Sequence, residues 1–282
     1  MDREIVLTVL ALVLCGPLLC VGAWWPLPRA DGSSARHIEP ACWTRMWLPL
    51  LPAVIVLAAL CGWALREPDN AEPVPFPLLL ATLPFAAVWC RAGVRAIRTC
   101  GVSPVAVPAG TVGLLRPTAI VSPQLIAVLD GRALAAVGAH EEAHARHCDP
   151  LRIWLAQLVT DLQWPSPAAA ARLHKWLEAL ELARDEEARR AGIDGVDLAT
   201  AILAAARVSA GLARRSAIAT LGDKAEALAE RIRRLLAPLP QVELVSESRW
   251  RLILLGASVV TAMVVGALCG ETAVHALLVL VA

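Results

Sequence analysis

The sequence predicts a mainly α-helical membrane protein, with four transmembrane helices and a cytoplasmic α+β domain inserted between the third and the fourth. Three observations support this fold class. Hydrophobic residues make up 57% of the 282 residues and charged residues only 18%, which is far more apolar than a soluble domain of this length. Four long stretches are apolar and nearly free of charge. Between the last two of them, short β-rich pieces are followed by helical periodicity.

Each of the four stretches is long enough to cross about 30 Å of hydrocarbon as a helix of about 20 residues. The first ends on Trp24 and Trp25, whose indoles would lie at the headgroup level. Its length and the lack of a small-residue cleavage site disfavour a cleaved signal peptide. The third is the shortest and contains Pro75, Pro77 and Pro84, which membrane helices tolerate when neighbours satisfy the freed carbonyls. The predicted spans are residues 5–25, 46–65, 74–90 and 252–270.

These spans divide the chain into a three-span membrane region (1–90), a cytoplasmic domain (91–250) and a fourth span with a short tail (251–282). Positive charge concentrates on the cytoplasmic side of membrane proteins. The loop 26–45 and the segment after the third span contain six arginines: Arg29, Arg36, Arg45, Arg91, Arg95 and Arg98. We therefore expect a multi-pass protein of the cell membrane with both termini outside. Only about a dozen residues (271–282) follow the fourth span, so we expect no extracellular sensor domain.

Charge and cysteine content narrow the function classes. The net charge of +1 argues against direct nucleic-acid binding, which needs a clustered basic face; the lipid bilayer is the expected partner. Eight cysteines are scattered without a CxxC pair, a pattern typical of small buried residues rather than of a disulfide framework.

The predicted cytoplasmic domain has two parts. Short β-rich pieces at 105–107, 111–115 and 119–121 are separated by proline and glycine, as in a small meander. Helical patterns follow at 123–130, 131–147, 151–163, 167–191, 195–213 and 222–236. Strands that precede a metal-binding helix can offer an edge to an extended peptide, although three weak strands are also consistent with a purely structural role.

The run His140-Glu141-Glu142-Ala143-His144 is an HExxH motif. Two histidines four residues apart share one face of a helix, so both imidazoles can bind one Zn²⁺ ion. Glu141 is then placed to act as the catalytic base of a zinc peptidase, while Glu142 points about 100° away. The competing interpretation is an ordinary helix with hydrogen-bonded histidines, but buried histidines and a glutamate are costly without a partner.

A catalytic zinc needs a third protein ligand and an open position. His147 lies about 10 Å along the helix from His140, too far for one ion unless the helix breaks. Glu181 on a later helix is the better candidate, with Asp185 one turn further on and free to orient a ligand histidine. A plain charged helix face is the alternative for both carboxylates.

Two further roles remain open in the sequence. Asp149 precedes Pro150, so it either caps the next helix or supports a ligand histidine. The chain contains no tyrosine, so an oxyanion would have to be stabilised by a histidine, arginine, amide side chain or backbone N–H; His147, Arg184 and His174 are candidates.

Several motifs together resemble the BlaR/MecR-type membrane zinc metallopeptidases, over nearly the whole chain. They are three spans, the segments 115–117 and 120–122, the run 134–150 with HEEAH and Asp149-Pro150, the sequence ELARDE at 181–186, LAERIRRLL at 228–236, and a fourth span. The resemblance implies a gluzincin-like protease domain with His140, His144 and Glu181 as zinc ligands and Glu141 as the base. It also implies transcriptional induction by cleavage of a cytoplasmic winged-helix repressor of the BlaI/MecI type. The penicillin-binding domain of the β-lactam sensors has no counterpart here.

We therefore expect an integral-membrane zinc endopeptidase that cleaves a cytoplasmic protein. One alternative is a membrane quality-control protease of the HtpX/Ste24 type, which shares the HExxH and ExxxD patterns; three spans before the motif and one after it favour the first. The other is a non-catalytic membrane signal transducer with a structural zinc site, against which Glu141 counts because a structural site needs no base.

Overall fold

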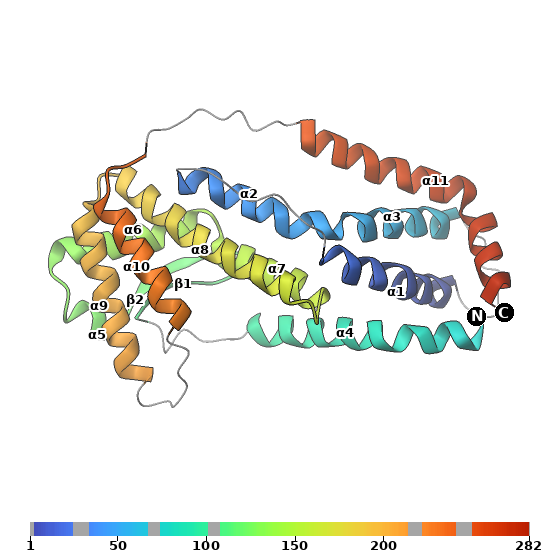
Figure 1. Cartoon of the computed structure of the whole chain (residues 1–282), viewed down its shortest axis with the longest axis horizontal. Helices are drawn as coiled ribbons and strands as arrows, with labels where there is room; N and C mark the ends of the chain where they lie inside the picture. Colours follow the sequence, from blue (N-terminus) through green and yellow to red (C-terminus); the bar gives the residue numbers. More distant parts are fainter. Residues whose placement is uncertain are drawn as a thin grey trace.

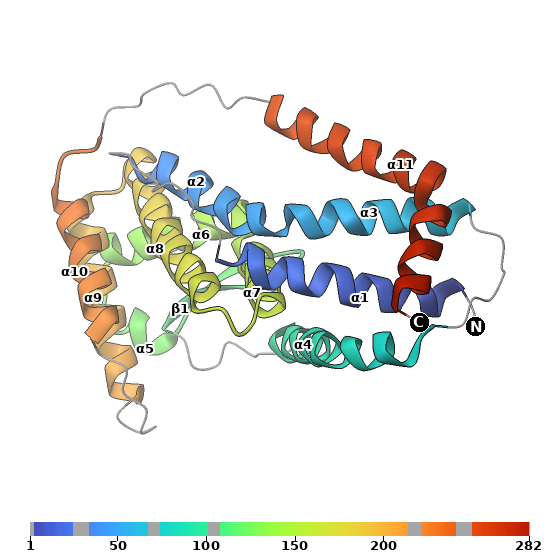
Figure 2. The ribbon, with the colours of Figure 1, turned by 45° about the vertical axis from the view of Figure 1, so that its right-hand side comes forward.

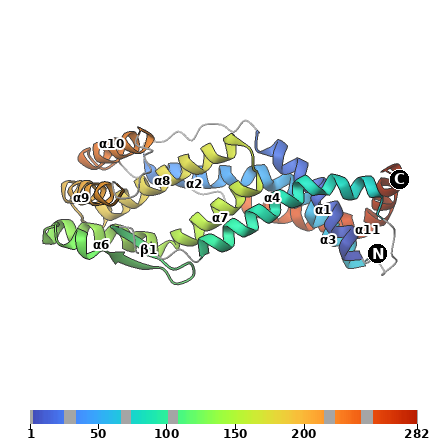
Figure 3. The ribbon, with the colours of Figure 1, turned by 90° about the horizontal axis from the view of Figure 1, so that it is seen from below.

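A computed structural model of the chain describes residues 3–24, 34–66, 74–100, 108–213, 222–240 and 250–281. The molecule is elongated: the most apolar helices occupy one end, and the remaining helices with a small sheet occupy the other (Figures 1 and 3). Helix α1 begins and α11 ends at the end away from the sheet. The predominance of helix, the four apolar helices and the small sheet confirm the mainly helical fold class at this level.

Four helices are long and apolar enough to cross a membrane, as predicted. They are α1 (Arg3–Gly22), α3 (Leu51–Arg66) with the segment before it, α4 (Phe76–Cys100) and α11 (Trp250–Val281). α11 packs along α3, and α1 packs against both α3 and α4. Backbones of α3 and α11 approach closely at two glycines: a side-chain carbon at Gly62 would overlap the carbonyl of Met263, and one at Gly266 the carbonyl of Ala59. Small residues allow such close helix packing inside a membrane.

The second span is longer than predicted. Residues 34–45, expected to be loop, enter a helix that runs on through α2 (Ala35–Trp47), a 3₁₀ turn (Leu48–Leu50) and α3. Ile38, Cys42 and Met46 recur every fourth residue and therefore share one face of α2, which packs against Trp176 and Leu180. Charged residues between them hide this pattern from a search for uninterrupted apolar runs.

The third and fourth spans also extend past their predicted ends. α4 continues from residue 90 to Cys100, because its last turns pack against α7 (Asp149–Leu162). Arg91 and Arg95 pair with Asp161 at 3.4 and 2.9 Å, and the indole N–H of Trp154 donates to the Ala96 carbonyl at 2.9 Å. α11 begins at Trp250 rather than 252 and continues to Val281. α4, the third span, thus connects the apolar end of the molecule to the end that contains the sheet.

The remaining elements follow the predicted order. Strands β1 (Ala109–Val112) and β2 (Thr118–Val121) form an antiparallel hairpin in which Thr111 pairs with Ala119. The chain turns at Gly113, whose φ of 98° suits glycine. The predicted strand 105–107 lies outside the described residues. The helices are α5 (Pro123–Ile126), α6 (Gly131–Arg146), α7, α8 (Pro167–Arg190), α9 (Gly195–Ala213) and α10 (Gly222–Leu236).

Packing around α6 fixes the position of the HExxH motif. One face of α6 packs on α9 through Ala133, Val137 and Ala201, and another contacts α8 and α10 around Ala136 and Leu235. The sheet covers a third side. Figure 2 shows α6 enclosed by α8, α9 and β1. The motif is therefore held in a well-packed part of the structure, and α6 begins on a firm cap, since Asp130 accepts a hydrogen bond from the Ala133 N–H at 2.8 Å.

We predict that Gly266→Leu destabilises the packing of α3 on α11, because the new side chain has no space beside the Ala59 carbonyl. Overpacking of this kind costs about 1–3 kcal/mol. Thermal unfolding of the purified protein in detergent measures the effect. Gly256→Leu on the same helix is the control, since no atom lies within 4 Å of that position. Equal melting temperatures for the two variants would contradict the packing described above.

Candidate metal centre

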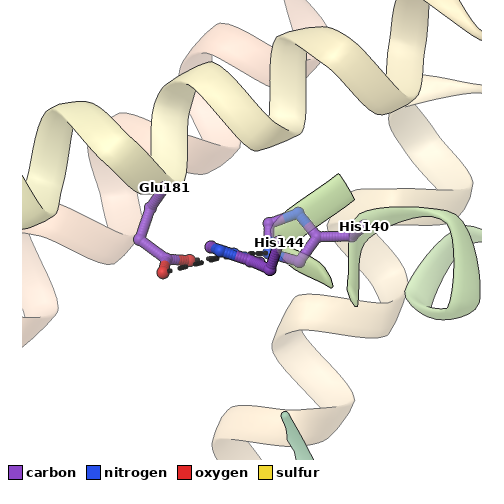
Figure 4. Close-up of side chains that lie close together, drawn as sticks. All are labelled: His140, His144 and Glu181. Carbon is purple, nitrogen blue, oxygen red and sulfur yellow. Dashed lines mark hydrogen bonds and ion pairs between the residues drawn. The ribbon is translucent and has the colours of Figure 1, made fainter. Parts of the chain in front are cut away.

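His140, His144 and Glu181 come together at one point between α6 and α8 (Figure 4). Their ligand atoms all lie within 4.8 Å of one another. The two imidazole Nε2 atoms are 3.2 Å apart, and each lies 3.6 Å from one Glu181 carboxylate oxygen. The group could therefore hold a metal ion.

The donor set could hold zinc by the number and type of its ligands. Tetrahedral zinc with ligands at about 2.0–2.1 Å places neighbouring donor atoms about 3.3–3.4 Å apart. The two Nε2 atoms, 3.2 Å apart, are close to this spacing, and each lies 3.6 Å from a different oxygen of the Glu181 carboxylate. Both histidines are buried, whereas the Glu181 side chain is 37% exposed. The site is thus closed on the histidine side and open beside the carboxylate, as a catalytic metal site requires.

The Nδ1 atom of each histidine, on the side of the ring away from Glu181, lies next to a carboxylate. The Nδ1 atom of His144 lies 2.8 Å from Asp149 Oδ2 in a hydrogen bond. The Nδ1 atom of His140 lies 3.0 Å from Asp185 Oδ1, at an angle poor for a hydrogen bond. A carboxylate at Nδ1 fixes the ring and directs Nε2 toward the metal. Both Nε2 atoms accordingly face Glu181.

Arginines hold these carboxylates in turn. Arg184 makes a two-pronged contact with Asp149, with Nε at 2.6 Å and Nη2 at 3.0 Å. Arg231 does the same for Asp185, at 2.8 Å from each nitrogen, and its Nη1 lies 2.8 Å from Glu181. Forked contacts of this kind fix both distance and plane. The carboxylates that orient the histidines are therefore themselves held in place by arginines.

The electrostatics favour a positive charge at this point. Burial lowers the pKa of His140, but Asp185 and Glu181 outweigh it and raise that pKa to about 10. Burial raises the pKa of Glu181, while His140, Arg231 and His144 bring it below its usual range. The pKa of Asp149 is likewise lowered, against burial, by His144 and Arg184. The carboxylates thus stay ionised, and a metal ion would compete with protons for the histidines.

Glu141 lies in the same cleft as the three ligands. This cleft has a volume of about 780 Å³ and is lined by His140, His144, Glu181 and the whole of β1. The Thr111 hydroxyl on β1 lies 3.0 Å from Glu141 Oε2 and 3.0 Å from its carbonyl oxygen. The base predicted from the motif is therefore held between the metal ligands and the strand. Glu142 is exposed on the other side of α6.

The structure separates several alternatives left open by the sequence. His147 is outside the ligand group: its Nε2 lies 2.9 Å from Glu187 Oε2. Asp149 is the first residue of α7 and not its N-cap, which is Cys148 with a left-handed backbone. Of the three oxyanion candidates, Arg184 is buried against Asp149, and neither it nor His147 nor His174 lines the cleft.

Residue type and motif spacing do not identify Arg231 as a site residue in the sequence. It lies in the run 228–236 and is the cation that lines the cleft beside Glu181. Its position in the helix could have identified it. Leu228 lies three residues before it and Leu235 four residues after it, so the arginine shares the apolar face of α10. A charged side chain on such a face implies a buried partner.

Comparison of the chain with protein-family models, curated proteins and solved structures finds no match.

We predict that Glu181→Ala lowers the zinc content of the purified protein, because two histidines alone leave the ion without its charged ligand. His147→Ala should bind zinc as the wild type does. Competition with a chromophoric chelator measures both affinities, and Glu178→Ala, an exposed carboxylate on the same helix, is the control. Loss of zinc in the His147 variant with retention in the Glu181 variant would mean that the ligand set is wrong.

Proposed function

We propose that the protein is a membrane-bound zinc endopeptidase that cleaves a cytoplasmic protein. The observation that supports this most directly is the grouping of His140, His144 and Glu181 at zinc spacing, with Glu141 in the same cleft. A structural zinc site is closed by four protein ligands. Among the residues the structure describes, three side chains converge here and the third is partly exposed.

The protein groups have distinct roles in the proposed reaction. Zinc, when bound, supplies a Lewis acid that acidifies a water molecule and polarises the scissile carbonyl. Glu141 takes the proton of that water and passes it to the leaving amine. Thr111 orients the Glu141 carboxylate through their 3.0 Å contact. His140, His144 and Glu181 would hold the ion, and Arg231 offsets part of the negative charge of Glu181.

The cleft offers a way to bind an extended peptide. All four residues of β1 line it, and β1 pairs with β2 on one edge only within the described part of the chain. An extended peptide can add to such an edge through backbone hydrogen bonds. We infer that a substrate segment lies along β1, which brings its backbone past Glu141.

The substrate and the side of the membrane rest on the sequence. The arginines near the inner ends of the spans and the resemblance to BlaR/MecR-type enzymes support a cytoplasmic site and a winged-helix repressor as substrate. Arg91 and Arg95 lie where α4 leaves the apolar end and meets α7, a position typical of cytoplasmic positive charge.

We predict that Glu141→Gln retains zinc but loses cleavage by about 10²–10⁴-fold, the usual contribution of a general base. The purified protein in detergent is incubated with a proteome-derived peptide library, and new termini are identified by mass spectrometry. Glu142→Gln is the matched control, since its side chain is adjacent but exposed. Unchanged cleavage by zinc-loaded Glu141→Gln would overturn the mechanism.

A further inference from the structure

The second spanning helix is too long for the membrane alone. Residues 35–66 form one helix of 32 residues, about 48 Å at about 1.5 Å per residue, whereas the hydrocarbon core is about 30 Å thick. The excess lies at its N-terminal end, where α2 contains Arg36, Glu39 and Arg45. This end lies beside α8, which carries Glu181 (Figures 1 and 2). The extension of this span therefore packs directly on the helix that carries Glu181.

α2 is fixed to α7 and α8 by polar contacts at two places. Glu39 is buried, accepts a hydrogen bond from the indole N–H of Trp176 at 2.8 Å, and pairs with Arg152. At the start of α2, the Ser34 hydroxyl and the Ala35 N–H donate to Glu186 at 2.7 and 2.9 Å. A buried carboxylate is costly unless it is paired. The apolar packing of α2 on α8 does not by itself require a buried carboxylate at Glu39.

Each of these two contacts of α2 is adjacent to a carboxylate that lies against His140 or His144. Arg152, which pairs with Glu39, also donates to Asp149 Oδ1 at 3.0 Å, and Asp149 Oδ2 lies 2.8 Å from His144 Nδ1. This gives an unbroken chain of contacts from the membrane-spanning helix to the metal ligand. At the second point, Glu186 follows Asp185, the neighbour of His140.

Aromatic rings hold the central arginine in place. The Arg152 guanidinium lies 4.7 Å from the Trp43 ring centroid and 5.5 Å from that of Trp176. Trp43 belongs to α2 and Trp176 to α8, and their rings contact each other with centroids 4.9 Å apart, so the guanidinium lies against both rings at the edge of the contact between these helices. A shift of α2 along α8 would change the position of Trp43 and Glu39, and with it the place of the Arg152 guanidinium beside Asp149.

We propose that Glu39 is a positioning residue that couples the α2–α3 span to the metal centre, acting on His144 through Arg152 and Asp149. The proposal rests on the proposed function, because it takes His144 as a ligand of the catalytic zinc. With α2 in its docked position, Asp149 holds the His144 ring with Nε2 toward Glu181. Displacement of the span draws Arg152 away from Asp149 Oδ1 and leaves Arg184 as the arginine that holds this carboxylate, which weakens the support of the His144 ring and with it the zinc site.

Zinc affinity of Glu39→Gln tests the coupling. Glutamine keeps an oxygen for Trp176 and nearly the same volume, but it removes the charge that holds Arg152. We expect zinc affinity to fall about tenfold, the lower end of the ~10–100-fold effect of losing a partner of a ligand histidine. The visible absorption of the Co²⁺-substituted protein should change as the His144 ring reorients. Glu178→Gln on the exposed face of α8 should match the wild type in both measurements.

A double-mutant cycle with Asp149→Asn identifies the route. If Glu39 acts through Asp149, the double variant binds zinc about as weakly as Asp149→Asn alone. Additive losses, or wild-type affinity in Glu39→Gln, would overturn the proposal. If Glu39→Gln does not fold, Arg152→Lys replaces it in the cycle: it keeps the charge, loses the bridge between Glu39 and Asp149, and is expected to weaken zinc binding in the same way.

Failure of the coupling and failure of the proposed function give different results. Wild-type zinc affinity in the Glu39 variant, with cleavage abolished by Glu141→Gln, would exclude the coupling and leave the peptidase in place. Weakened zinc binding in the Glu39 variant, with normal cleavage by Glu141→Gln, would support the coupling to a metal site and exclude the peptidase mechanism.

Discussion

Two buried imidazoles whose Nε2 atoms are 3.2 Å apart impose the constraint on which this structure depends. Nitrogen atoms at that distance, with a carboxylate 3.6 Å from each, are stable in a buried place only if a positive charge is shared among them. A hydrogen bond to Asp149 orients the His144 ring, and the Asp185 carboxylate lies 3.0 Å from His140 Nδ1 on the opposite side of that ring. The arrangement therefore favours a positive charge at this point, and the group could hold a metal ion.

The need to hold those carboxylates accounts for much of the surrounding architecture. Asp149 must sit at the very start of α7, which brings the chain through a left-handed residue at Cys148 directly after α6. Asp185 and Glu181 are one turn apart on α8, so Arg231 on α10 can reach both. α6, α7, α8 and α10 thus each contribute to one polar cluster, and the apolar contacts between these helices fix their distances.

The spans belong to the same mechanical unit. α4 is joined to α7 by Asp161 pairing with two arginines, and α2 is joined to α8 around Trp176. α4 is one helix over Phe76–Cys100, and α2 continues through the 3₁₀ turn Leu48–Leu50 into α3. The part of the molecule that contains the candidate metal centre therefore contacts the apolar helices at two places.

The sequence predicted what depends on local pattern and missed what depends on contacts between distant segments. Four apolar runs predicted the spans, and helical periodicity predicted α6 to α10 nearly to the residue. The HExxH spacing places His140 and His144 on one face of a helix by geometry alone. Only a few carboxylates on the later helices were candidates for the third ligand, and Glu181 was one of them. Arg231 could not be found this way, because Asp185 is 46 residues away in sequence. Glu39 and Arg152 are 113 residues apart, and in both cases only the packing of helices brings the partners together. α2 falls in a predicted loop because its apolar residues are separated by charged ones, and its contact with α8 is what buries that face.

X-ray absorption at the zinc edge, on the purified full chain in detergent, tests the central claim most directly. We predict one zinc per chain, about four nitrogen or oxygen ligands at about 2.0–2.1 Å, and the scattering of two imidazoles. A sulfur shell at about 2.3 Å, which would place a cysteine such as Cys148 on the ion, or a protein that binds no zinc, would contradict the assignment of His140, His144 and Glu181 as its ligands.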